Sequence, residues 1–90
     1  MNLPDDIVAK VTRDFRDAQE REFVLDTLSN LSVNDKNRVI RCVLFCAAGD
    51  IEMFRTMEEL ARVDYRDAIM NGEYEYPSCK RLRNFNEPFA

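Results

Sequence analysis

The sequence has no histidine among its 90 residues. Histidine is the commonest general base at neutral pH and the commonest metal ligand, and Ser–His and Cys–His nucleophile pairs both require it. Three cysteines are too few for an all-thiolate zinc site, and no C-x-x-C spacing occurs. Two glycines cannot build the phosphate-binding loops G-x-x-x-x-G-K or G-x-G-x-x-G. We therefore expect no catalytic residues, no metal and no cofactor, and a protein that is not an enzyme.

Residues that break helices are also scarce, with two glycines and three prolines. So few breakers favour helices over many short strands joined by turns. The composition, 46% hydrophobic and 33% charged, is typical of a folded domain and not of a disordered chain. We expect a single domain over residues 1–90, with a helical core at about 4–72 and a tail at 73–90.

No long apolar segment is present. Residues 1–6 lack the basic and apolar regions of a signal peptide. The apolar run Val39–Ala48 is about half the length that spans a bilayer, and Arg41 interrupts it. Cys42 and Cys46 lie four residues apart in this run, which suits buried, reduced thiols. These features predict a cytoplasmic protein that has no membrane segment.

The clearest signal in the sequence is Gly49-Asp50, where one helix is expected to end and the next to begin. Gly49 can take the left-handed conformation that ends a helix, and Asp50 can cap the helix that follows. The preceding helix is apolar on nearly all sides, which predicts a central position, and Ser32 or Asn34 is its expected cap.

Two helices are expected before this central helix. The first begins near Pro4 and presents a core-facing stripe. Asp17 caps the second, which runs to about Leu31; one bent helix over residues 4–31 is the alternative. The expected core-facing residues are Ile7, Val8, Val11 and Phe15 in the first helix and Phe23, Val24, Leu28 and Leu31 in the second, with Leu25 at the edge.

After Asp50 the pattern predicts an amphipathic helix that ends before Asp64, then a short capped helix, Tyr65–Asn71, with Gly72 as its stop. A single helix over 51–70 is the alternative. The expected inner residues are Phe54, Met57, Leu60 and Ala61, and the expected outer residues are Arg55, Glu58, Glu59 and Arg62. The predicted fold is all-α: a compact bundle of four or five short helices, with helical hairpins around a central apolar helix and an extended aromatic and basic tail.

The hairpin at Asn34–Met70 resembles the helix pairs of HEAT and TPR arrays. The TPR signature residues are absent, and one or two pairs do not make an array. The resemblance therefore implies helix packing and carries no function over to this chain.

The tail combines aromatic and basic residues. Residues 50–75 carry eight acids and three bases, a net charge of −5, whereas residues 76–90 have a net charge of +2. We expect the tail to be ordered, with its aromatics packed on this domain or on a second copy. Its bases would then lie near acids of the preceding segment. The bases are Lys80, Arg81 and Arg83, and the acids are Glu52, Glu58, Glu59, Asp64 and Asp67.

The leading functional hypothesis is a non-enzymatic protein–protein interaction or regulatory module, with a protein partner or a second copy of the chain as its ligand. Tyrosine, phenylalanine and arginine anchor interfaces. The candidate partner-binding residues are Tyr65, Tyr74, Tyr76, Arg81, Arg83, Phe85 and Phe89.

Two rival functions stay open. A carboxylate-dependent Mg²⁺ or Mn²⁺ enzyme would use Glu58, Asp64 and Asp67. A nucleic-acid regulator would use the tail or the bases Lys36, Arg38 and Arg41, although the net charge of −4 disfavours it.

Overall fold

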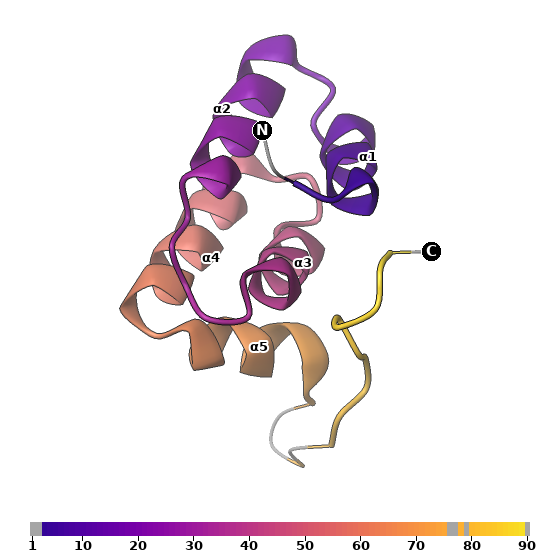
Figure 1. Ribbon diagram of the computed structural model, residues 1–90, viewed down its shortest axis with the longest axis vertical. Coiled ribbons are helices and arrows are strands. Elements are labelled where there is room, and N and C mark those ends of the chain that lie inside the picture. Colours follow the sequence, from indigo (N-terminus) through magenta and orange to yellow (C-terminus); the bar gives the residue numbers. More distant parts are fainter. Residues whose placement is uncertain (1–2, 76–77, 79, 90) are drawn as a thin grey trace.

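The computed structural model describes residues 3–75, 78 and 80–89. These residues form five α-helices and an extended tail (Figure 1). The helices are α1 (Asp5–Asp14), α2 (Ala18–Ser29), α3 (Lys36–Ala47), α4 (Ile51–Val63) and α5 (Tyr65–Glu73). The predicted all-α bundle is confirmed.

Helix α3 is the central element. It packs against α1, α4 and α5, and in Figure 1 it lies between α1, α5 and the tail. Seven of its twelve residues are buried. The apolar sequence of this helix, which leaves few polar sides to face water, explains the central position. The buried residues of α3 are Val39, Ile40, Arg41, Cys42, Val43, Leu44 and Ala47.

Side-chain caps separate the helices where the sequence predicts breaks. Asp17 accepts hydrogen bonds from the backbone N–H groups of Gln19 and Glu20, so α1 and α2 are two helices. Asp50 accepts from Glu52 and Met53 and starts α4.

Asp64 accepts from the N–H of Arg66, which separates α5 from α4. The two-helix reading of residues 51–70 is therefore right.

The expected cap of α3 was wrong. Neither Ser32 nor Asn34 is the cap; Asp35 takes that place in the left-handed conformation, at φ 52°, without a side-chain hydrogen bond to the helix. Aspartate tolerates this conformation better than most residues. At the other end of α3, Ala48 and Gly49 are both left-handed, at φ 49° and 82°, so the predicted turn is present and one residue longer.

Gly72 is not a helix stop, and α5 continues through it to Glu73. A Cβ at position 72 would lie 2.5 Å from the Cβ of Cys42. The glycine is therefore needed for close packing of α5 on α3, because no side chain fits between the two backbones.

The predicted orientations of two side chains, one on α4 and one on α2, differ from the structure. Glu58, predicted to face outward, is buried at 7% exposure and pairs with Arg62. Phe23, predicted to face the core, is 41% exposed, and α2 buries only Val24 and Leu28 within its bounds. The expected Phe54, Met57 and Ala61 are buried, and Leu60 is half-buried.

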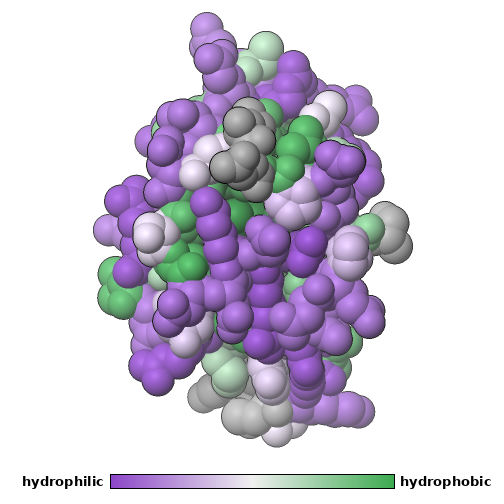
Figure 2. Space-filling model, in the orientation of Figure 1, coloured by the Kyte–Doolittle hydropathy of each residue, from purple (hydrophilic) through white to green (hydrophobic). Residues whose placement is uncertain are grey.

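Across the face shown in Figure 2 the surface is mostly hydrophilic, with hydrophobic residues in small separate patches. No helix among the described residues is long and apolar enough to span a membrane.

Candidate functional site

The tail is attached to the helices through Glu73, the last residue of α5. Its side chain is fully buried, and both carboxylate oxygens are bound. Arg38 of α3 donates from Nη2 to Oε1 at 2.7 Å and from Nε to Oε2 at 2.9 Å. From the tail, Arg81 donates from Nε to Oε1 at 3.1 Å and the N–H of Phe85 donates to Oε2 at 2.9 Å. One carboxylate thus joins α3, α5 and the tail.

The surroundings of Glu73 decide its charge. Burial alone would raise the pKa of the carboxyl group, since it disfavours the charged form. The hydrogen bonds from Arg38 and from the Phe85 amide, together with the positive charges of Arg38 and Arg81, outweigh burial and lower the pKa below its ordinary value. Glu73 is therefore ionised at neutral pH, as a buried charge with two guanidinium partners.

Backbone contacts extend this attachment. The carbonyl oxygen of Glu73 accepts from the N–H groups of Leu82 at 2.7 Å and Arg83 at 3.2 Å. Tyr74 and Arg81 form an antiparallel bridge. Arg83 Nη1 donates to the carbonyl of Gly72 at 3.1 Å. The tail therefore turns back along the end of α5.

A second carboxylate, Asp6 of α1, holds the far part of the tail. Arg41 of α3 binds both Asp6 oxygens, at 2.9 and 3.1 Å, and donates from Nη1 to the carbonyl of Phe85 at 3.1 Å. The N–H of Phe89 donates to Asp6 at 3.1 Å. The guanidinium of Arg41 and the Phe89 amide lower the pKa of Asp6. Arg41, the base within the apolar run, therefore links α1 to the tail.

The tail aromatics complete the docking. Phe85 is 9% exposed and belongs to the hydrophobic core, and Phe89 is half-buried against it. The Phe85 ring lies 5.5 Å from that of Phe45 and 5.6 Å from that of Phe89, between ring centroids. The guanidinium of Arg83 covers Phe45 at 4.2 Å. Of the two surfaces predicted for the tail's aromatics, this domain or a second copy, the structure shows the first for Phe85 and Phe89.

The other predicted tail contacts have mixed outcomes. Arg81 pairs with Glu73 and not with the acids expected for it, because the tail folds back along the end of α5. Tyr65 and Tyr74 are half-buried against the core. The position of Cys79 in the polar tail predicts an accessible thiol, but Cys79 and Tyr76 both lie outside the described residues.

The two cysteines of α3 differ in burial. Cys42 is buried beneath Gly72, and burial, together with the nearby charge of Glu73, raises its pKa to about 12. Cys46 is half-buried, less than expected; burial raises its pKa, and the charge of Arg83 opposes that rise. Both thiols are free, and Cys42 is far from the ionised form that reacts.

The carboxylates of the rival metal site are not brought together. Glu58 pairs with Arg62, and Asp64 caps α5 and pairs with Arg66. Within the described ranges no three or more Asp, Glu, Cys or His side chains are grouped as a metal would require.

The bases of the rival nucleic-acid site are bound within the molecule. Arg38 and Arg41 hold Glu73 and Asp6. Lys36 donates to the carbonyl of Ser29 at 3.1 Å. Guanidinium groups that are already bound to buried carboxylates are poorly placed to bind phosphates.

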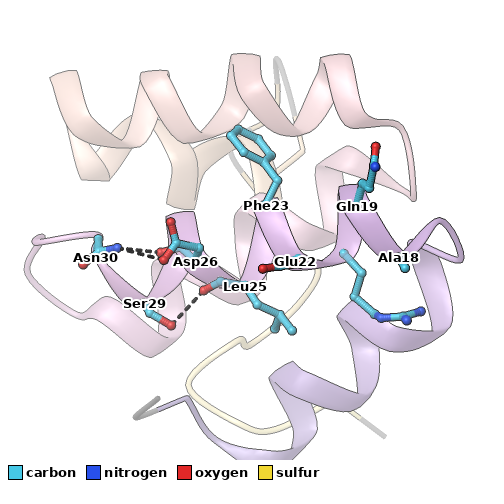
Figure 3. Close-up of a pocket in the computed structure, with 9 residues that line it drawn as sticks. Ala18, Gln19, Glu22, Phe23, Leu25, Asp26, Ser29 and Asn30 are labelled. Carbon is cyan, nitrogen blue, oxygen red and sulfur yellow. Dashed lines mark hydrogen bonds between the residues drawn. The ribbon is translucent and has the colours of Figure 1, made fainter.

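An open face lies elsewhere, on α2. A shallow hollow of about 890 Å³ follows this helix from Ala18 to Asn30 (Figure 3). In the close-up, Phe23 points from α2 toward α4 and Leu25 points to the opposite side of the helix. Asp26, Ser29 and Asn30 lie at one end of the hollow, and Gln19 and Ala18 at the other.

Phe23 rests on α4 although it is largely exposed. Its ring meets the ring of buried Phe54 edge-on, with centroids 6.3 Å apart. The Arg55 guanidinium lies 5.0 Å from the Phe23 ring centroid. The ring is thus held by Phe54 and Arg55 and is still 41% exposed, as an interface anchor is expected to be.

Sequence reasoning missed two features of the site. Glu73 and Asp6 were not among the candidate residues, although Arg41 within an apolar helix signals a buried carboxylate partner. Phe23 was assigned to the core because the period of α2 allows it, and only the packing of α2 shows the ring's exposure.

Comparison of the chain with protein-family models, with curated proteins and with solved structures found no match in any of the three.

Proposed function

We propose that this protein is a non-enzymatic binding module for another protein, and that the face of α2 around Phe23 is its partner surface. The observation that carries the proposal is the exposed, firmly seated Phe23 ring beside the hollow along α2. Exposed aromatic side chains in such settings anchor protein interfaces.

The arrangement of the tail supports this choice of surface. Phe85 and the Arg81 guanidinium, both candidate partner-binding groups, already bind the domain itself. A partner that used them would first have to displace the tail from Glu73 and Asp6. The Phe23 face requires no such rearrangement.

Site-specific photocrosslinking in cells that make the protein tests the proposal. A photoreactive amino acid is placed at Glu22, an exposed residue that lines the hollow, or at Asp67, an exposed residue of α5. We expect a discrete adduct with another protein from position 22 and not from position 67. Phe23→Ser should abolish the adduct, whereas the matched control Val63→Ser, at an 80% exposed position, should keep it.

The opposite pattern would contradict the proposal. An adduct that survives Phe23→Ser, or that forms equally well from position 67, would show that α2 is not the partner surface. An adduct that forms only from photoreactive residues in the tail would show that the tail, and not α2, binds the partner.

A further inference from the structure

We propose that the segment bound at the Phe23 face is a basic stretch of a partner protein, with lysines or arginines on both sides of one large apolar side chain. This inference rests on the proposed function. It adds the chemistry of the partner, which follows from the charges around Phe23.

The carboxylates of this face are uncompensated. Glu22 and Asp26 of α2 line the hollow, and Glu52 and Glu59 of α4 lie one helical turn before and after Arg55; all four are exposed. Among the part of the chain that the structure describes, none of these four takes part in an ion pair. Asp26 accepts from the Asn30 side chain at 3.4 Å, which leaves its charge in place.

The bases of the same two helices offset only half of this charge. Arg62 pairs with Glu58, and Arg21 donates to the carbonyl oxygen of Phe15 on the side of α1. Arg21, which lines the hollow and keeps its charge when it donates to a carbonyl, and Arg55, against the Phe23 ring, are the bases that remain beside the four acids. The face is therefore net negative and complementary to a basic segment, and it repels nucleic acid and an identical face of a second copy.

The exposed Phe23 ring determines which kind of basic segment fits this face. Phe23 offers one ring, supported by Phe54 and accessible beside the hollow along α2. One ring accommodates one large apolar side chain, and the surrounding carboxylates would then meet the bases that flank it. A segment with charge alone would leave Phe23 in water, and an apolar segment without bases would leave the carboxylates unpaired.

Selection from a phage-displayed library of random peptides tests the proposal on the full chain. Enriched peptides are synthesised with a fluorophore, and their binding is measured by anisotropy at low and physiological salt. We expect net positive peptides with one large apolar residue, bound more weakly at higher salt. Both Glu22→Lys/Asp26→Lys and Phe23→Ser should weaken binding at least tenfold.

A matched variant controls for total charge. Asp5→Lys/Asp67→Lys makes the same change in net charge at exposed positions of α1 and α5, and it should leave the affinity within twofold. Thermal melting of each variant confirms that it folds.

The outcomes separate this inference from the proposed function. Acidic or neutral peptides that depend on Phe23 would overturn the basic partner and leave the face as a binding surface. If no enriched peptide depends on Phe23, both proposals are wrong. A Phe23-dependent dimer in sedimentation would assign the face to a second copy and overturn the basic partner.

Discussion

Glu73 shows how a single residue organises the molecule. Its carboxylate is fully buried, yet two arginines and one backbone N–H satisfy it. A buried ion pair of this kind adds modest net stability, but removal of one partner leaves the other charges unpaired. The arrangement therefore makes the position of the tail sensitive to this one side chain.

We expect Glu73→Gln to lower the free energy of unfolding at pH 7 by about 3 kcal/mol, because it leaves Arg38 and Arg81 without their carboxylate. Denaturant unfolding measures the change. The matched substitution Glu59→Gln, at an exposed acid, should change stability by less than about 0.5 kcal/mol. Equal stabilities of the two variants would contradict the structural role of Glu73.

The same pairs predict an acid limit to stability. The pKa values of Glu73 and Asp6 are lower in the folded state than in the unfolded chain. The unfolded state therefore binds more protons as the pH falls, and stability declines from about pH 4, the ordinary carboxyl range, down through the folded pKa values. Unfolding measured from pH 7 to pH 2 should show this decline, with a shallower slope in Glu73→Gln. A slope that is identical in both proteins would contradict it.

Gly72 gives a prediction opposite to helix propensity. An exposed helical Gly→Ala change stabilises by about 1 kcal/mol. We expect Gly72→Ala to destabilise by about 1–3 kcal/mol, since its Cβ would lie 2.5 Å from the Cβ and 2.9 Å from the Cα of Cys42. Adding Cys42→Ala should not rescue it, because these two atoms remain. Thermal melts that rise with Gly72→Ala would contradict the close approach of α3 and α5.

At the scale of elements, the turn between α3 and α4 depends on local chemistry. We expect Asp50→Ala to cost about 0.5–2 kcal/mol through the loss of the cap on Glu52 and Met53. Gly49→Val should cost about 1–3 kcal/mol, because φ is 82° there and a Cβ would meet the Asp14 carbonyl at 3.0 Å. Denaturant unfolding measures both changes, and Glu87→Ala, at an exposed acid outside the helices, is the control. Unchanged stability in both variants would mean that neither residue fixes the turn.

The helices illustrate what sequence can specify. The caps Asp17, Asp50 and Asp64 and the apolar surface of α3 are local signals, and each predicted its element. The cap of α3 was missed because a left-handed Asp35 follows from the path of the loop and not from its own propensity. Gly72 was misread because the need for a glycine there comes from Cys42, thirty residues earlier in the chain.

The candidate site was less predictable than the helices. The aromatic and basic residues of the tail predicted that it packs on a surface. In the structure Phe85 joins the hydrophobic core, and Arg81 pairs with Glu73. The two carboxylates that hold the tail, Glu73 and Asp6, could not be selected from seventeen acids by composition, because the choice depends on which helix ends meet. The exposure of Phe23 likewise depends on how α2 lies over α4.

At the scale of the whole molecule, the docked tail acts as part of the core. We expect Phe85→Ala to lower stability by about 3 kcal/mol, because Phe85 fills a site against Phe45 and Phe89. Leu82→Ala, in the same tail but 49% exposed, is the matched control and should change stability by less than about 0.5 kcal/mol. Denaturant unfolding distinguishes the two; equal effects would indicate a tail that contributes nothing specific.

Amide hydrogen exchange tests most directly the central claim that the tail is bound to its own domain. The N–H groups of Leu82, Phe85 and Phe89 donate to Glu73 and Asp6. We predict that the Phe85 amide exchanges as slowly as the amides of α3, and that Glu73→Gln speeds it up. Exchange of all three amides at the rate of an unprotected peptide, while α3 stays protected, would contradict the account and show that the tail is free.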